Sequence, residues 1–483
     1  MYDNQLVCDV FGSLCIEKAR INSCDITKQG IPSFVAEWLL DKIVPGTGEL
    51  TIAEVEKLNN FIQSAFPRKE DKNVIHFQLS EGETKVVIAL MQARVKMEKA
   101  GQLAAEPLAK IDALGFTEPS LNIPVDIVRK HEMLLRHGVW GKVTLAKIDS
   151  EQVEVIGFDP FQCSSVNFKL YEQYRSQFTT TQWKDLMVCS MGINPEHPNY
   201  NDEAKTWVLA RLLPLVMPNF HVIELAPKGT GKSFFFENVS SKVIVIGGGK
   251  VTPSQLFING KTKEVGLLGR YSTVIFDEVQ SLTFDNPDEI IGTFKGYLAN
   301  GRYNRSGYAD IASDCSTVML ANIELDRDLR PRNEHYLVGD LPQLFSETAL
   351  LDRFAGIIPG WEIPKFQASM KARQFALKAD FFGEVLFAMR RDARYSTYAQ
   401  QHSHISIGTS GDCEAGIRDN DAILQSAAGF LKILYPHLQL TPEDFYRDCL
   451  QPAARLRQYV RNSLCYLDEE YRNQPPELIV ELR

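Results

Sequence analysis

The spacing of hydrophobic positions changes several times over the first 178 residues, which indicates a mixture of helices and strands. Apolar residues recur every three to four positions in three predicted helices, at 31–43, 52–66 and 127–135. Shorter runs of strand type lie between and after them, at 73–79, 85–95, 139–148 and 153–158. We therefore expect an α+β N-terminal domain over residues 1–115, followed by a β-containing subdomain or connector over 116–178.

From residue 179 the pattern is that of helices alternating with strands. Residues 180–186 predict an N-capped helix and residues 201–216 a longer amphipathic helix. Three strongly apolar runs follow, each leading into glycine or polar residues: 221–225, 271–278 and 316–322. Continuous apolar runs are typical of buried parallel strands, so residues 179–365 predict a three-layer α/β core. Residues 366–483 are predicted to form a helical lid and further helices, interrupted by a polar loop over 397–420.

A glycine-rich turn follows the first apolar run. Residues 226–233 read Ala-Pro-Lys-Gly-Thr-Gly-Lys-Ser, one residue short of the P-loop pattern because Ala226 stands where the pattern has glycine. Backbone N–H groups of such a turn, together with a helix N-terminus, bind phosphate groups. We predict that Lys232 contacts the β- and γ-phosphates of ATP and that Ser233 ligates Mg²⁺. The other predicted nucleotide-binding residues are Pro227, Lys228, Gly229, Thr230 and Gly231.

The second and third apolar runs end in side chains suited to the same site. Asp277 would add a metal ligand, and Glu278 would orient and deprotonate the attacking water. Asn322 would polarise that water or contact the γ-phosphate. The alternatives are an ordinary acidic turn after the second run and common turn chemistry after the third. Following a P-loop, this order of residues predicts an ATPase that uses Mg²⁺.

Basic residues between these two runs suggest a nucleic-acid contact. Residues 294–309 predict a helix end and a β-hairpin that carries Arg302 and Arg305. In a hexameric ring, such a hairpin would point into the central pore and meet a phosphate backbone. The alternative is a solvent-exposed hairpin whose arginines keep it soluble. A glycine-rich loop contributes Lys250 as a weaker candidate for the same channel.

Arg353 follows a short apolar helix in the sequence Leu-Leu-Asp-Arg-Phe. In ring ATPases an arginine at this position faces the nucleotide of the neighbouring subunit, where it stabilises charge on the γ-phosphate. The alternative is a local cap or ion pair, the ordinary role of a single arginine.

Composition narrows the class of protein only in part. A chain of 483 residues that is 44% hydrophobic is long enough for two or three domains with sizeable cores. Its net charge of −9 argues against a globally basic surface but is compatible with a local basic pore. The nine cysteines form no C-x-x-C pair, so neither a zinc site nor a disulfide framework is expected. We expect a cytoplasmic protein without a membrane partner, because no apolar stretch reaches the length of a membrane span.

The order of these motifs resembles that of AAA+ ATPases of the hairpin-bearing clade that includes the MCM helicases. A closer resemblance is to the BrxL family, Lon-related AAA+ proteins of BREX phage-defence systems. It rests on residues 178–186, 209–216, 226–233, 275–279, 350–365 and 427–436. The resemblance implies a DNA motor or clamp that forms a homohexamer or a double hexamer. It also implies that the N-terminal domain helps to engage double-stranded DNA, and that other BREX components are possible partners.

The resemblance implies two further features. A lid arginine should contact the nucleotide, and Arg455 is the first candidate, with Arg457 and Arg390 as alternatives. A Lon-like domain with a Ser/Lys dyad usually follows the ATPase, so a chain that stops at Arg483 is expected to lack peptidase activity, as a natural short form or a truncation. Two other functions stay open. One is a protein-remodelling ATPase with Phe257 in a pore loop, and the other is a nucleotide-gated scaffold with little hydrolysis.

Overall fold

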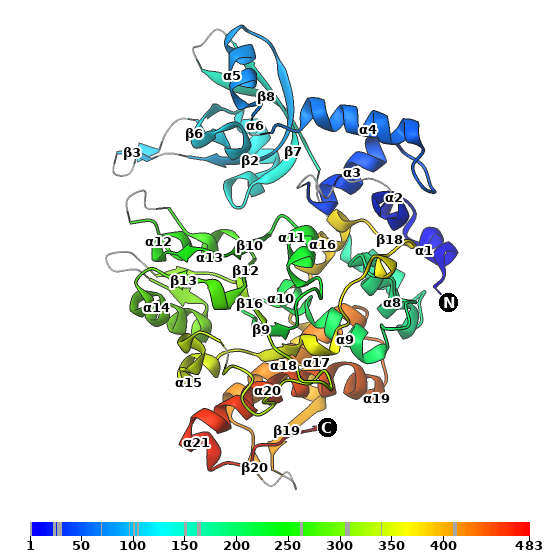
Figure 1. Cartoon of the computed structure of the whole chain (residues 1–483), viewed down its shortest axis with the longest axis vertical. Helices are drawn as coiled ribbons and strands as arrows, with labels where there is room; N and C mark the ends of the chain where they lie inside the picture. Colours follow the sequence, from blue (N-terminus) through cyan, green and yellow to red (C-terminus); the bar gives the residue numbers. More distant parts are fainter. Residues whose placement is uncertain are drawn as a thin grey trace.

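The chain is elongated, with a β-barrel at one end, a parallel sheet in the middle and helices at the other end (Figure 1). The computed structural model describes residues 2–22, 26, 31–68, 70–95, 97–99, 102–103, 106–148, 152–161, 166–260, 264–304, 310–339, 341–408 and 413–483. Within these ranges, no helix has the length and apolar character needed to cross a membrane.

The barrel is built from five strands. They pair in the order β2 (Lys85–Arg94), β5 (Leu108–Ile111), β6 (Phe116–Asn122), β8 (Val153–Pro160) and β7 (Val139–Lys147). Alternate residues of β2, among them Val87, Ala89 and Met91, are buried in the barrel core, as the two-residue period of a strand requires. The barrel contains strands from both sides of the expected boundary at 115/116. Smaller elements of this region are β3 (Met97–Lys99), β4 (Gln102–Leu103) and α6 (Val125–Lys130).

Five helices in the described ranges precede the barrel in the chain, and the last two of them contact it. They are α1 (Asn4–Phe11), α2 (Lys18–Asn22), α3 (Ser33–Ile43), α4 (Ile52–Ala65) and α5 (Lys72–Ser80). The helices expected at 31–43 and 52–66 are confirmed. The strand expected at 73–79 is wrong, because this segment is helix α5. Its alternating apolar residues misled the prediction: Ile75 and Leu79, four positions apart, pack on the barrel core, whereas Phe77 is 64% exposed.

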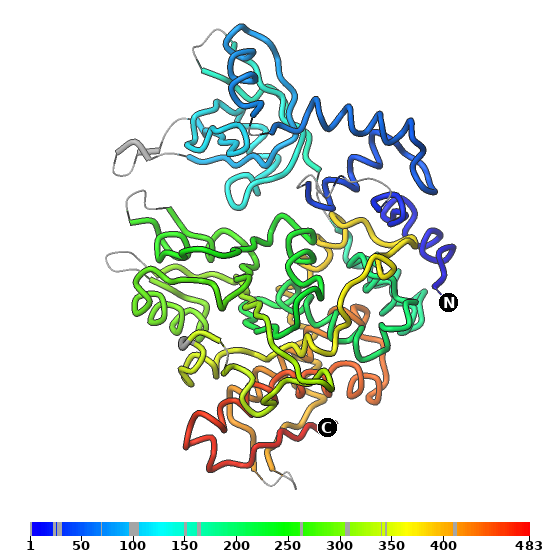
Figure 2. The backbone as a smooth tube through the Cα atoms, viewed as in Figure 1, coloured from blue at the N-terminus to red at the C-terminus, as the bar shows by residue number. Residues whose placement is uncertain are grey.

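The N-terminal segment is part of the half of the molecule that contains the parallel sheet. Strand β1 (Cys15–Glu17) pairs antiparallel with β18 (Phe375–Leu377), and Figure 2 shows these distant parts of the chain side by side. Val7 and Phe11 of α1 belong to the same buried cluster as the core helices. This half therefore consists of more than residues 179–483.

The central sheet has five parallel strands. Their order is β10 (Val243–Gly247), β12 (Thr273–Asp277), β16 (Ser316–Asn322), β9 (His221–Ala226) and β17 (Gly356–Pro359). Consecutive residues of a strand enter different cores: Val222 lies in one buried cluster and Ile223 in the other. Because both faces of the sheet are covered, its strands are apolar throughout, and the predicted three-layer α/β core is confirmed.

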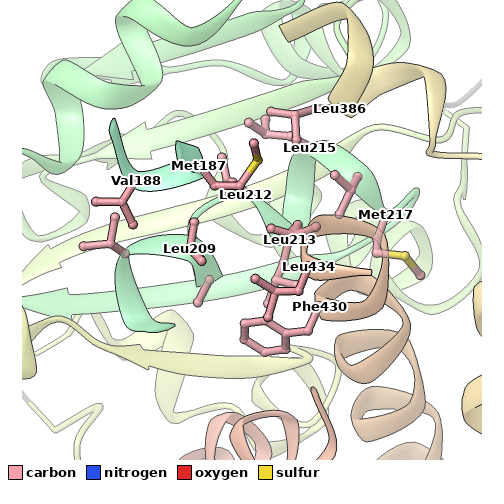
Figure 3. Close-up of a cluster of buried hydrophobic side chains, with 14 of the residues drawn as sticks. Met187, Val188, Leu209, Leu212, Leu213, Leu215, Met217, Leu386, Phe430 and Leu434 are labelled. Carbon is pink, nitrogen blue, oxygen red and sulfur yellow. The ribbon is translucent and has the colours of Figure 1, made fainter. Parts of the chain in front are cut away.

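One face of the sheet is covered by α8 (Thr180–Ser190), α9 (Asp202–Ala210), α10 (Leu213–Val216), α16 (Ala379–Ala388) and α18 (Ile417–Leu434). The N-cap predicted for the first of these helices is a capping box between Thr179 and Gln182. Figure 3 shows Leu213 and Leu215 packed among Leu386, Phe430 and Leu434. Gly429 permits this packing, because a β-carbon there would lie 2.6 Å from Leu213 Cδ2.

The other face contacts the segments between the strands. These contain α12 (Pro253–Leu256), α13 (Leu267–Arg270), α14 (Pro287–Asn300) and α15 (Thr348–Leu351). Helix α11 (Lys232–Val239) instead packs with the helices of the first face, through Phe235, Phe236 and Val239. The long C-terminal helix α20 (Gln451–Leu467) crosses β17, where a β-carbon on Gly356 would lie 2.6 Å from Leu456 Cβ. Glycine at 356 therefore lets this helix approach the sheet.

The polar loop expected over 397–420 is wrong in part. Helix α17 (Arg394–His402) leads into β19 (Ser403–Ile407), which pairs with β20 (Cys413–Glu414) and β21 (Leu478–Leu482). Ile405 and Ile407 are buried, but the polar residues Ser403, His404 and Ser406 of the same strand concealed it. Its partner β21 lies far along the chain. The remaining helices here are α19 (Pro442–Phe445) and α21 (Glu469–Arg472).

Candidate nucleotide-binding site

The glycine-rich turn connects the end of β9 to the start of α11. Gly229 has φ +88° and Gly231, the N-cap of α11, has φ +75°, both in the left-handed region. A β-carbon at either position would meet no atom within 4 Å, so glycine is needed there for its backbone conformation. The turn thus places backbone N–H groups and a helix N-terminus together, as phosphate binding requires.

Ala226 departs from the P-loop pattern at little structural cost. It is the last residue of β9 and pairs in register with Asn322 of β16, so its backbone is extended. Its side chain packs against Gly360, where a β-carbon would lie 2.3 Å from Ala226 Cβ. The absence of a side chain at Gly360 therefore makes room for the methyl group of Ala226. The phosphate-binding turn is unaffected.

Four of the predicted catalytic and binding side chains come together at the carboxyl edge of the sheet. Lys232 Nζ donates a hydrogen bond of 2.8 Å to Asn322 Oδ1. Burial lowers the pKa of Lys232, while the carboxylates of Glu224, Asp277 and Glu278 act in the opposite direction. Asp277, the last residue of β12, and Glu278 directly after it are therefore within electrostatic reach of the lysine.

Glu278 has an unusual backbone conformation. Its φ of +49° lies in the left-handed region, and its N–H donates to Asp277 Oδ1 at 2.9 Å. A left-handed residue other than glycine costs on the order of 1 kcal/mol, and such residues cluster at functional sites. Sequence analysis missed Gln280, whose side-chain amide donates to the carbonyl of Asn322 at 2.5 Å. This bond ties the turn after β12 to the end of β16.

Ser233 and Asp277 fit the role of magnesium ligands that act together with a nucleotide. Both are half-buried at the start of α11 and the end of β12. In the part of the chain that the structure describes, no group of three or more His, Cys, Asp and Glu side chains could hold a metal ion alone. Magnesium in ATPases is typically bound by one or two protein oxygens and the phosphates, so a site of this kind is filled together with ATP.

A buried ion pair behind the turn was missed by sequence analysis. Arg211 Nη2 lies 2.6 Å from Glu224 Oε1, and both residues are at most 1% exposed. Both terminal nitrogens of Arg211 also contact the carbonyl of Thr230 at 3.3 Å. The ion pair therefore fixes the backbone of the P-loop at Thr230. The available signal was Glu224 itself, a charged residue inside an apolar strand.

Replacing Arg211 with methionine should lower the free energy of unfolding by about 3–5 kcal/mol, because it leaves Glu224 buried without a counter-charge. Chemical denaturation measures the loss. The double variant Arg211→Met/Glu224→Leu removes both charges and should be more stable than the single variant. If the double variant is as unstable as the single one, the unpaired charge is not the cause.

Arg353 lies at the opposite edge of the sheet from the P-loop. Ala355 N–H donates to the carbonyl of His221, the first residue of β9, whereas the P-loop follows its last residue. The strand between them is roughly 20 Å long. Arg353 lines a cleft of about 480 Å³ together with Asn219, Asp352 and Arg418. This position separates Arg353 from the nucleotide site of its own chain.

The three lid-arginine candidates differ in their surroundings. Arg455 is half-buried, donates to Glu203 at 2.7 Å and lies 4.9 Å from the ring centroid of Trp207. Arg457 is fully buried in ion pairs with acidic residues. Arg390 binds main-chain carbonyls, including that of Pro214, near the amino edge. Only Arg455 of the three is accessible, and its contact with nucleotide stays a prediction.

The predicted hairpin is confirmed where the structure describes it. Strand β14 (Arg302–Tyr303) pairs antiparallel with β15 (Ile311–Ala312), directly after α14. Arg302 is exposed, and Arg305 lies outside the described residues. Lys250, in β11 (Lys250–Val251), is also exposed and forms an ion pair of 2.8 Å with Asp285.

Phe257 is not available as a pore-loop aromatic in this structure. It is 1% exposed, and its ring centroid lies 5.5 Å from that of Tyr303 and 6.3 Å from that of Phe294. The side chain is thus a core residue beneath the hairpin. The protein-remodelling alternative loses the residue on which it rested.

Comparison with known proteins gives matches over most of the chain. A family model described as "Lon-like protease BrxL-like, ATPase domain" matches residues 153–477. A second, "BREX system Lon protease-like protein BrxL N-terminal", matches residues 9–146.

Individual relatives agree with the family models. The Lon-like protease BrxL of Escherichia coli O9:H4 (strain HS) is 26% identical over 456 residues, which cover 92% of this chain and 63% of the relative. The Lon-like protease BrxL of Bacillus cereus (strain H3081.97) is 28% identical over 458 residues, 91% of this chain and 64% of the relative. An uncharacterized protein, ORF426, of Acidianus filamentous virus 1 is 28% identical over 215 residues, 39% of this chain and 50% of that protein. The chain thus spans less than two thirds of the length of the two BrxL relatives.

Proposed function

Because this chain belongs to the BrxL family of BREX systems and has an AAA+ ATPase core, we propose that it hydrolyses ATP as a ring on double-stranded DNA. The observation that supports the proposal is that the predicted site residues lie at two opposite edges of the sheet. Lys232 and Asn322 lie at one edge, and Arg353 lies at the other. A second copy placed head to tail brings the two parts together, and repetition of that contact closes a homohexamer, single or stacked.

Each residue has a definite part in the proposed reaction. The glycine turn and Lys232 bind the phosphates, and Asn322 orients the attacking water. Glu278 accepts the proton of that water as it attacks the γ-phosphate. Arg353 of the neighbouring subunit stabilises the charge that develops on the γ-phosphate. Ser233 and Asp277 would hold Mg²⁺ together with the nucleotide, and the ion would supply positive charge to the phosphates.

The hairpin is the proposed DNA contact inside the ring. Tyr303 of β14 is buried against Phe257 and Tyr297, which anchors the hairpin, while the adjacent Arg302 is exposed. A cation on an anchored hairpin suits a phosphate backbone and needs no basic surface elsewhere, in agreement with the net charge of −9. The proposal covers both a motor and a clamp. Partnership with other BREX components stays a prediction.

Replacing Arg302 and Arg305 with alanine should abolish stimulation of ATP turnover by duplex DNA and leave basal turnover unchanged. For the wild-type protein, higher salt should weaken DNA binding. The double variant should have a shallower slope of log affinity against log salt, by about 1 for each phosphate that the protein no longer neutralises. Turnover with and without duplex DNA at two salt concentrations, together with DNA affinity at the same concentrations, measures these effects. Arg373→Ala, at an exposed arginine outside the hairpin, is the matched control.

Turnover that is robust but indifferent to DNA would contradict the DNA proposal, and a protein substrate would then be the better explanation. Equal loss of stimulation in Arg373→Ala would show that the hairpin is not the specific contact.

A further inference from the structure

Arg457, in the middle of α20, binds the chain on both sides of Arg353. Its guanidinium is fully buried and lies 2.5 Å from Asp352 Oδ1. The same group donates to the carbonyl of Asp352 at 3.0 Å and to the carbonyl of Phe354 at 2.8 Å. One side chain thus fixes three acceptors on the two residues that flank Arg353.

The guanidinium of Arg457 is itself fixed by an ion pair with Asp419. Arg457 Nε lies 2.6 Å from Asp419 Oδ1, and the other oxygen of Asp419 pairs with Arg461 Nη1 at 2.5 Å. The second oxygen of Asp352 pairs with Arg418. Planar guanidinium groups with several fixed partners have little rotational freedom, so this network gives the backbone at 352–354 one geometry.

Arg353 has few contacts of its own. Its Nη1 donates to the carbonyl of Ala349. Its Nε is buried and has no hydrogen-bond partner among the described residues. The direction of its side chain therefore depends on the backbone from which it projects, and that backbone is fixed by Arg457.

We propose that Arg457 is a positioning residue that aims Arg353 at the nucleotide of the neighbouring subunit. This inference rests on the proposed function, because it presumes a site shared between two copies. Arg457 touches neither nucleotide. Loss of Arg457 should therefore impair only the neighbouring subunit's nucleotide site, which Arg353 completes. ATP binding by the P-loop of the same subunit should not change.

The test compares Arg457→Lys with Arg461→Lys. Lysine keeps the charge of Arg457 but cannot hold the carboxylate and both carbonyls at once. Because a displacement of about 1 Å can cost 10²-fold in rate, turnover of Arg457→Lys should fall on the order of 10²-fold. ATP affinity should stay within about twofold of wild type, since the Kd is set by the subunit's own P-loop. Arg461 is equally buried and also pairs with Asp419, but it reaches residues 352–354 only through Asp419 and Arg457, so Arg461→Lys should lower turnover far less than Arg457→Lys.

Mixed rings separate positioning from a merely structural role. Lys232→Ala subunits have a defective P-loop and an intact Arg353, so they can complete the site of an Arg457→Lys neighbour. An active interface needs the intact P-loop of an Arg457→Lys subunit beside the intact Arg353 of a Lys232→Ala subunit. In a random 1:1 mixture each occurs with a probability of about one half, so about one interface in four is active. Turnover of this mixture should recover well above that of either parent. A mixture of Arg457→Lys with Arg353→Ala should not recover.

The outcomes distinguish the two proposals. If Arg353→Ala mixed with Lys232→Ala gives no recovery, the shared site of the proposed function is wrong. If that mixture recovers but Arg457→Lys with Lys232→Ala does not, the positioning role of Arg457 is wrong. Should Arg457→Lys fail to fold, Asp352→Asn, which weakens the same interaction in a nearly isosteric side chain, undergoes the same mixing test with the same two outcomes.

Discussion

Replacing Arg353 with alanine is expected to lower ATP turnover of the assembled protein by about 10³-fold or more, with ATP affinity nearly unchanged. An arginine supplied to a neighbour's γ-phosphate contributes factors of about 10³ to 10⁵ in rate. Affinity should survive because Arg353 lies at the edge of the sheet opposite its own P-loop. Steady-state turnover and a separate fluorescence titration with a nucleotide analogue measure the two quantities.

Two further variants sharpen this prediction. Arg353→Lys keeps the charge and loses the planar donor fork, so its turnover should lie between those of wild type and Arg353→Ala. Arg418→Ala removes the neighbouring arginine in the same cleft and tests whether any cation there suffices. A loss of ATP affinity as large as the loss of turnover in Arg353→Ala would place Arg353 in the binding of its own nucleotide, against the shared site.

Replacing Glu278 with glutamine is expected to lower turnover by about 10² to 10⁴-fold, the usual contribution of a general base. Glutamine has nearly the same shape and an amide that cannot accept the proton of the water. The left-handed backbone at this position is no more costly for glutamine than for glutamate, so fold and ATP binding should persist. Single-turnover hydrolysis together with ATP affinity measures the effect.

Glu237→Gln is the matched control for that experiment. Glu237 lies on α11 close to Asp277, and burial together with the charge of Asp277 raises its pKa, but it is not at the end of a strand. Its replacement should change turnover little. Anti-phage activity that persists in Glu278→Gln would favour the nucleotide-gated scaffold, because the scaffold needs ATP binding and not hydrolysis.

The grouping of the predicted site residues at the carboxyl edge of the sheet was predictable because they belong to short local patterns. The P-loop, Asp277 with Glu278, and Asn322 each follow an apolar run, and parallel strands bring their carboxyl ends to one edge. The partners of the supporting arginines were not predictable, although Glu224 inside an apolar strand was a signal for one buried pair. Nothing in the sequence near Arg211 or Arg457 distinguishes these arginines from exposed ones. Their ion-pair partners lie beyond the local sequence pattern and become neighbours only in the folded structure.

The mistaken secondary structure has a similar cause. In the α5 segment, apolar residues at alternate positions fit a strand as well as a short helix, and packing on the barrel decided for the helix. Strand β19 forms because it pairs with β21, which lies too far along the chain to be recognised from the local sequence pattern. The lid arginines were equivalent in sequence, and burial alone separates Arg455 from Arg457 and Arg390.

The pairing of β1 with β18 has a consequence for synthesis on the ribosome. The hydroxyl of Tyr2 donates to the carbonyl of Phe375, 373 residues further along the chain. At about 5–20 residues per second, the N-terminal segment waits roughly 20 to 75 s for this partner to be made. The barrel strands between residues 85 and 160 need no such delay. The N-terminal segment is thus among the last parts of the chain to reach its final place, and during that interval the apolar side of α1 is available to chaperones.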